Sequence, residues 1–186
     1  GACDWSSDVC SSDLHRAKLN VLVCAKALVT FARKMEERYD IPYISVSFYG
    51  KRDTTNAIMA IAEALGDPDL IKRARAVCAR EEAKLERALQ PYRKILEGKK
   101  AILNTGGNKS WSIASALQDL GLDVVATSIR KATQDDIEKC RETLGEQGVL
   151  MKSPANEQAK LIDEYGVDLL LAGGRSLYTA IKKRIC

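Results

Sequence analysis

Two short segments of this chain pair glycines with a basic residue. The first is Thr105-Gly106-Gly107-Asn108-Lys109, and the second is Ala172-Gly173-Gly174-Arg175. Each follows an apolar run typical of a strand and precedes a helical pattern, and such joints are where α/β proteins bind ligands. Glycine lets a ligand approach the backbone closely, and the unpaired N–H groups at a helix start favour an anion. The two segments therefore predict an anion site, unless their glycines serve only the packing of a buried turn.

Cysteine is the other residue type here with metal chemistry. The cysteines are Cys3, Cys10, Cys24, Cys78, Cys140 and Cys186. Their spacing contains no Cys-x-x-Cys and fits neither a zinc knuckle nor a ferredoxin, and nothing indicates secretion. We therefore expect reduced thiols, and a metal bound by one of them must take its other ligands elsewhere. Taken by itself, Cys24 fits a small buried apolar residue.

The composition is that of an ordinary soluble protein. The chain has 186 residues, of which 46% are hydrophobic and 29% charged, and its formal net charge is +4. Charged residues interrupt every apolar run before it reaches the roughly 20 residues that cross a bilayer, so we expect no membrane-spanning segment. Basic and acidic residues are interleaved, which argues against a nucleic-acid surface. These features favour a cytoplasmic protein.

The first 14 residues differ from the rest. Residues 1–14 show neither a helical nor a strand period, and they lack the basic and apolar regions of a signal peptide. Residues 4–14 resemble the translation of a sequencing adapter. We therefore expect residues 1–14 to be a disordered artefact that contributes nothing to fold or function.

Apolar periodicity predicts a partial α/β lobe over residues 15–66. Its first element is expected to be one helix over Leu19–Tyr39, which would carry Cys24. A strand is expected within Ile41–Phe48, and a further helix runs from about Asp53 to a stop at Gly66.

The remaining chain predicts a connecting helix over residues 67–98 and a Rossmann-like lobe over residues 99–186. In the second lobe strands and helices alternate, which implies a parallel sheet with helices on both faces. The expected strands and helices are Ala101–Asn104, Lys109–Leu120, Val124–Thr127, Gln134–Leu144, Val149–Met151, Asn156–Tyr165, Asp168–Ala172 and Ser176–Lys183. The two glycine segments then lie at the same edge of the sheet.

Six segments together resemble the nitrogenase molybdenum-iron protein superfamily, or nitrogenase component 1. These segments are His15–Leu28, Arg33–Tyr39, Ser47–Gly50, Thr105–Ser112, Ser115–Gly121 and Ala172–Ala180. The resemblance covers nearly all of residues 15 to 186. Within the superfamily the chain is most similar to the scaffold subunits on which the iron-molybdenum cofactor of nitrogenase is assembled. It implies that superfamily's α/β fold, and a role in cofactor assembly with no catalytic residue of its own.

The resemblance also implies a cluster site. Cys24 matches the cysteine that holds one end of an iron-sulfur precursor cluster, and a cysteine in the first turn of a helix would have its thiolate favoured by the N–H groups there. Gly106, Gly107 and Lys109 match the turn that lies against the cluster, where a basic side chain donates hydrogen bonds to sulfides.

A second ligand is implied at the other glycine segment. Gly173 and Arg175 match the turn near homocitrate, and molybdenum is the metal finally expected in the cofactor. The implied partners are a NifN-type subunit in a heterotetramer, the nitrogenase iron protein as reductase, the cluster donor NifB and apo-nitrogenase as acceptor. The resemblance further implies a middle-to-C-terminal fragment, with the ligand opposite Cys24 lying outside it.

Two other functions compete with this interpretation. One is the catalytic α subunit of nitrogenase, or of a vanadium or iron-only relative. The other is a nucleotide- or sugar-phosphate-binding Rossmann-like module that uses the two glycine segments for a phosphate.

Overall fold

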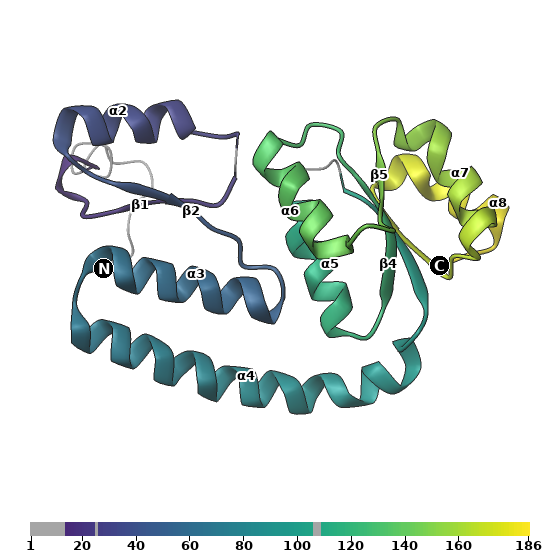
Figure 1. Cartoon of the computed structure of the whole chain (residues 1–186), viewed down its shortest axis with the longest axis horizontal. Coiled ribbons are helices and arrows are strands. Elements are labelled where there is room, and N and C mark those ends of the chain that lie inside the picture. The colour runs from purple at the N-terminus through teal and green to yellow at the C-terminus, as the bar shows by residue number, and fades with distance from the viewer. Residues whose placement is uncertain (1–13, 25, 106–108) are drawn as a thin grey trace, which may run out of the picture.

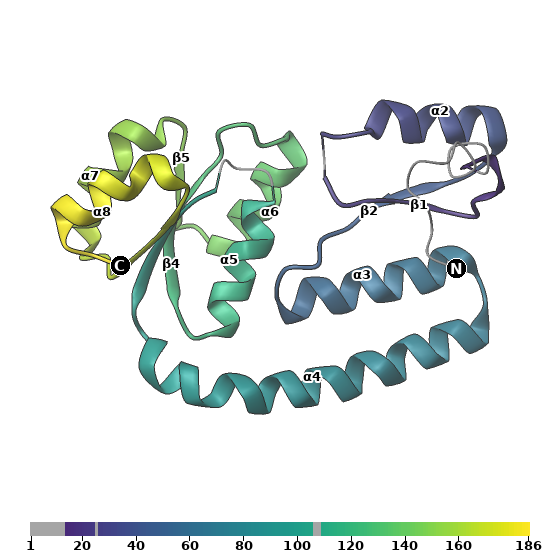
Figure 2. The same ribbon diagram turned by 180° about the vertical axis from the view of Figure 1, so that it is seen from behind.

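The computed structural model describes residues 14–24, 26–105 and 109–186. This described part forms a smaller N-terminal lobe and a larger C-terminal lobe, with one long helix, α4, running beneath both (Figure 1). The view from behind in Figure 2 shows the same arrangement. Helix α4 spans Pro68–Leu96, and the side chain of Asp67 caps it by accepting hydrogen bonds from the N–H groups of Asp69 and Leu70. The predicted start of this helix is confirmed.

Charged side chains run along α4. Lys84 Nζ lies 2.9 Å from Glu81 Oε1 on its exposed surface, a kind of pair that adds little stability. Near its end, Arg93 Nε donates to the carbonyl oxygen of Asp119 at 2.7 Å and so ties α4 to the C-terminal lobe.

Across the described residues, no helix is both long enough and apolar enough to cross a membrane.

A parallel sheet forms the centre of the C-terminal lobe. Within the described residues it has four strands in the order β5-β4-β3-β6. The strands are β3 (Lys100–Asn104), β4 (Asp123–Ser128), β5 (Val149–Met151) and β6 (Leu169–Ala172). The elements between and after them are α5 (Ser110–Asp119), α6 (Gln134–Leu144), α7 (Pro154–Tyr165), the 3-10 turn η2 (Gly174–Ser176) and α8 (Leu177–Lys183). The predicted alternation and the parallel sheet are confirmed.

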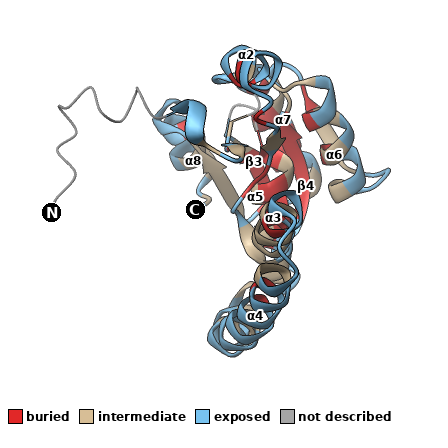
Figure 3. Ribbon diagram, turned by 90° about the vertical axis from the view of Figure 1, so that its left-hand side faces the viewer, coloured by how far each residue is buried: buried red, intermediate tan, exposed pale blue. Residues whose placement is uncertain are grey.

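Alternate residues of β3 serve opposite faces of this sheet. Ala101 and Leu103 pack with apolar side chains of α5, whereas Ile102 packs with those of α7 on the other face. All three have no exposed surface. Because helices cover both faces, the strand is an unbroken apolar run instead of an alternating one. In Figure 3 the buried residues concentrate on β3, β4 and α5.

The N-terminal lobe contains a short parallel pair of strands. Its elements are η1 (Leu14–Arg16), β1 (Asn20–Leu22), α2 (Val29–Tyr39), β2 (Tyr43–Ser45) and α3 (Gly50–Leu65). Asn20 lies opposite Tyr43, and Leu22 lies opposite Ser45. Helix α3 begins three residues before the predicted Asp53, and it ends as predicted at Gly66, whose φ of 70° is left-handed.

The prediction of one helix over Leu19–Tyr39 is wrong in its first half. Leu28 has a left-handed φ of 61°, and α2 starts only after it. Upstream, the β-branched Val21 belongs to a strand because β2 supplies backbone partners, and no local pattern reveals that pairing. Cys24 therefore lies in the connection between β1 and α2 and not in the first turn of a helix.

Helices α3 and α5 form the contact between the lobes. The hydroxyl of Ser47 donates to that of Ser112 at 2.7 Å, and both side chains are buried. Gly50 starts α3 with a φ of 71°, and a Cβ there would lie 2.9 Å from the Cα of Ala116 in α5. The two helices approach this closely because Gly50 has no side chain.

This close approach makes a prediction about stability. Gly50→Ala should destabilise the protein by about 2–5 kcal/mol, because it adds left-handed strain of about 1–2 kcal/mol and overpacking of about 1–3 kcal/mol. Denaturant unfolding of the two proteins measures the difference.

The matched control is Gly66→Ala. Gly66 has a φ of 70°, but a Cβ there would meet no atom within 4 Å. Gly66→Ala should therefore be destabilised only by the left-handed strain of about 1–2 kcal/mol. Equal losses for the two variants would show that α3 and α5 do not touch at Gly50.

Candidate functional site

Lys109 lies at the joint between β3 and α5. It is the N-cap of α5 and has a left-handed backbone, with φ 56° and ψ 22°. Gly106 and Gly107, which the sequence assigned to the same turn, lie outside the described residues. The structure therefore places Lys109 but leaves the predicted glycine part of this site untested.

The side chain of Lys109 crosses from the C-terminal lobe to the N-terminal lobe. It is only 5% exposed, and its ammonium donates to the carbonyl oxygen of Val46, which follows β2. Burial lowers the pKa of Lys109, while Asp136, Cys24 and Asp53 attract its charge and oppose that shift. The ammonium is thus a buried cation within electrostatic range of Cys24.

Asp136 holds this joint in place from α6. Its side chain is fully buried, and Oδ1 accepts hydrogen bonds from the backbone N–H of Lys109 at 3.4 Å and from Trp111 Nε1 at 3.0 Å. Oδ2 accepts from the N–H and the hydroxyl of Thr133, which completes a capping box. Burial on its own raises the pKa of Asp136, but the hydrogen bonds from Thr133, Trp111 and Lys109 bring it below its ordinary value.

Cys24 is half-buried and follows β1 by two residues. Its position after a strand removes the helix N–H groups that were expected to favour its thiolate. The structure supplies a different source of positive charge, since Cys24 interacts electrostatically with the ammonium of Lys109. A thiolate is a soft ligand suited to iron, and a nearby cation favours the thiolate over the thiol.

The other three thiols in the described residues differ from Cys24 in burial. Cys78 and Cys140 are buried, and Cys186 is exposed. Burial raises the pKa of Cys140 to about 11, and Asp136 adds to the shift. Among the described residues, no cluster of three or more histidine, cysteine, aspartate and glutamate side chains is arranged to hold a metal ion. Cys24 would thus provide a single ligand.

The second glycine segment follows β6, the strand next to β3. Asn104 at the end of β3 pairs in register with Ala172 at the end of β6, so these two strand ends are neighbours at the carboxyl edge of the sheet. Gly173 and Arg175 are exposed there and line a cavity of about 640 Å³. The predicted convergence of the two strand ends is confirmed, whereas the role of these residues stays a prediction.

Two further bases line this cavity and were missed from the sequence. Arg130 and Lys131 follow the end of β4, the neighbouring strand, and join Arg175 around the opening. The sequence does contain a signal for them, because a base directly after a parallel strand lies at the edge of the sheet where ligands bind. Three bases around one opening suit an anion with several carboxylate or phosphate groups.

Beneath these bases is a hydrogen-bonded polar floor. Asn104 Nδ2 donates to Gln158 Oε1 at 3.0 Å and to Ser176 Oγ at 3.2 Å. Ser176 Oγ in turn donates to Gln158 Oε1 at 3.2 Å, and both Ser176 and Gln158 are buried. This network joins β3, α7 and η2, so the edge of the cavity is held by paired polar groups.

Comparisons with known proteins identify the family and the fold. The profile of the family "Nitrogenase component 1 type Oxidoreductase" matches residues 11–185. The nitrogenase iron-molybdenum cofactor biosynthesis protein NifE from a Nostoc species is 52% identical over 172 residues, which are 92% of this chain and 36% of that protein. NifE from Klebsiella pneumoniae is 49% identical, again over 92% of this chain and over 38% of its own length.

The solved structures that match share the fold at lower identity. Nitrogenase Cp1 at pH 5 superimposes with a TM-score of 0.76 over 92% of this chain and 41% of its own chain, at 22% identity. The chain thus spans little more than a third of the NifE relatives described above.

Burial of Lys109 makes a prediction about pH. The folded state loses the proton of Lys109 below the ordinary pKa of 10.5, so between the lowered pKa and 10.5 the unfolded chain binds more protons. The cost of burying the charge is fully present below that window and is relieved as the pH rises through it, so stability should rise. The unfolding free energy of the wild type minus that of Lys109→Met should therefore become more positive from pH 7 towards pH 10.5.

Urea unfolding at a series of pH values measures this difference. Lys84→Met, which removes an exposed lysine from α4, is the control and should run parallel to the wild type. A difference between wild type and Lys109→Met that is flat or falls with pH would contradict the burial of this ammonium.

Proposed function

The chain belongs to the nitrogenase component 1 type oxidoreductase family, and from this membership we propose that it is part of a scaffold on which the iron-molybdenum cofactor is assembled. Two relatives named for cofactor biosynthesis are 49–52% identical to it, whereas the matching nitrogenase structure is 22% identical. That difference supports assembly over nitrogen reduction. The cargo is an iron-sulfur precursor cluster, held while it is matured.

The observation that supports the cluster site is that the buried ammonium of Lys109 reaches the N-terminal lobe at Val46, within electrostatic range of Cys24. Cys24 supplies a thiolate for iron at one end of the cargo. An ammonium has three donors, and one of those on Lys109 goes to Val46. A further donor turned towards a cluster sulfide would hold it by a charge-assisted hydrogen bond. Gly106 and Gly107 complete the proposed cradle.

The charge of the site suits this cargo. An iron-sulfur cluster with sulfide and thiolate ligands is anionic. The buried Lys109 ammonium offers it a cation whose desolvation has already occurred on folding. Asp136 fixes the backbone of Lys109, so the cation is positioned before the cargo arrives. These residues fit a cluster bound at one end by one protein ligand. Its other ligands come from elsewhere in the assembly.

Arg175 and Gly173 form the proposed site for the organic acid of the cofactor. The class of ligand is a tricarboxylate such as homocitrate, and its carboxylates match the three bases that open onto the cavity at the sheet edge. Molybdenum would enter with it. Because the polar floor of this cavity is already paired, the ligand needs to engage only the bases at its rim.

The proposed assembly extends beyond this chain. A NifN-type subunit would complete the scaffold as a heterotetramer, with NifB delivering the precursor, the nitrogenase iron protein supplying electrons and apo-nitrogenase receiving the product. All of this would take place in the cytoplasm.

The ligand assignment is tested by Cys24→Ala in the protein assembled with its NifN-type partner. Loss of the thiolate should reduce bound precursor cluster, measured by iron analysis and EPR, by at least about tenfold, since even changes around metal ligands cost about 10–100-fold in affinity.

Cys186→Ala, which removes an exposed thiol, is the matched control and should load normally. If the Cys24→Ala protein binds as much precursor cluster as the wild type, Cys24 is not a ligand of the cluster.

A further inference from the structure

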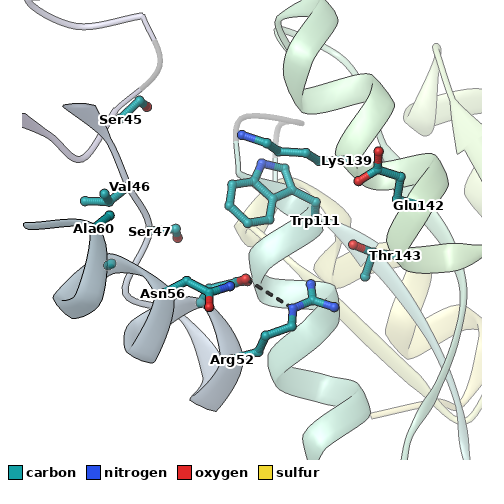
Figure 4. A pocket seen from close by; sticks show the side chains of 12 residues that line it. Ser45, Val46, Ser47, Arg52, Asn56, Ala60, Trp111, Lys139, Glu142 and Thr143 are labelled. Carbon is teal, nitrogen blue, oxygen red and sulfur yellow. Dashed lines mark hydrogen bonds and ion pairs between the residues drawn. The ribbon is translucent and has the colours of Figure 1, made fainter. Parts of the chain in front are cut away.

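A cavity of about 380 Å³ lies between the two lobes. One wall comes from α3 and the residues after β2, and the other comes from α5 and α6 (Figure 4). It shares no lining residue with the cavity at the carboxyl edge of the sheet. Its volume lies at the lower end of the range of small-molecule sites, about 300–1,000 Å³. The cavity adjoins the proposed cluster site, because Val46 in its wall accepts a hydrogen bond from the ammonium of Lys109, but neither Cys24 nor Lys109 lines it.

Asp53 on α3 lines this cavity with an unsatisfied carboxylate. Its side chain is 7% exposed, and Oδ1 forms an ion pair with Arg52 Nε at 3.3 Å. Oδ2 is buried, and among the described residues no donor lies within hydrogen-bond distance of it. A buried carboxylate oxygen without a donor is costly, so its retention in the wall of a cavity indicates a partner that enters from outside.

The opposite wall offers the complementary charge. Lys139 Nζ lies 4.9 Å from the centre of the Trp111 ring, and both side chains face the cavity (Figure 4). Glu142 lies one turn further along α6. The indole of Trp111 is fixed by its hydrogen bond to Asp136, so this wall is positioned in advance.

The charges around the cavity select among ligand classes. Its charged lining residues are two bases, Arg52 and Lys139, and two acids, Asp53 and Glu142, whose formal charges cancel. The buried ammonium of Lys109 is not part of the lining; it attracts Asp53 electrostatically but, within the part of the chain that the structure describes, leaves Oδ2 of Asp53 without a donor. A simple cation would meet both bases, and a simple anion would meet both acids. A small zwitterion matches the pattern, because its ammonium can donate to Asp53 while its carboxylate accepts from Arg52 or Lys139.

We infer that this inter-lobe cavity is a binding site for a small zwitterion of the α-amino acid class, with Asp53 as the receptor for the ammonium group. Arg52 and Lys139 receive the carboxylate, and Trp111 forms the apolar side of the site. Occupation would bridge α3 and α6 and so fasten the two lobes together.

Isothermal titration calorimetry on the full chain tests this inference. The probes are glycine, alanine and glutamate, with methylamine and acetate as the separate halves of a zwitterion. At least one amino acid should bind, and each half should bind at least about tenfold more weakly. Asp53→Asn should weaken the binding of that amino acid about 10–100-fold, the typical value of a hydrogen bond to a charged group.

Two further variants separate the site from general effects on folding. Arg52→Gln alters a side chain that is 53% exposed, and it should weaken amino acid binding but not methylamine binding, because it removes a cation that competes for Asp53. Asp163→Asn removes a 64% exposed carboxylate on α7 and should bind like the wild type. If no amino acid binds the wild type, or if Asp53→Asn binds as tightly as the wild type, the cavity holds only water and the inference is wrong.

Discussion

The ammonium of Lys109 is buried where the two lobes meet, and the site depends on it. Taking a charged amine out of water is unfavourable, and the lowered pKa of Lys109 records that cost. The structure offsets it with the carbonyl of Val46 in the N-terminal lobe and with the charges of Asp136, Asp53 and Cys24. Because these groups come from both lobes, the cation favours one relative placement of the lobes.

The other contacts between the lobes follow from this placement. Val46 continues directly from β2, and β2 pairs with β1, which leads to Cys24, so the lysine also sets where the thiol lies. Ser47 and Ser112 form a hydrogen bond beside it, and α3 can lie against α5 because Gly50 has no side chain. The long helix α4 then holds the two lobes from below, through Arg93. The proposed site, which takes one residue from each lobe, would therefore be assembled by folding before its ligand binds.

The C-terminal lobe could be predicted from sequence almost completely, and the N-terminal lobe only in part. In the C-terminal lobe each apolar run, such as Ala101–Asn104, is separated from the next by its own turn and cap signals, so local patterns suffice. Strand β1 is three residues long and exists because β2 lies beside it, which is a non-local fact. Its apolar spacing therefore predicts a helix, which places Cys24 on the wrong element. The residues of the proposed site, Cys24 and Lys109, stay a prediction from sequence, whereas the burial of Lys109 and its hydrogen bond to Asp136 depend on three-dimensional contacts.

The electrostatic coupling between Lys109 and Cys24 is the centre of this account, and it can be measured without any cluster. The measurement is the rate at which iodoacetamide alkylates Cys24 near pH 8, followed by peptide mass spectrometry in the wild type and in Lys109→Met. The account predicts slower alkylation of Cys24 in Lys109→Met, because the cation that favours its thiolate is gone, and an unchanged rate at the exposed Cys186. Equal rates at Cys24 in the two proteins would contradict it.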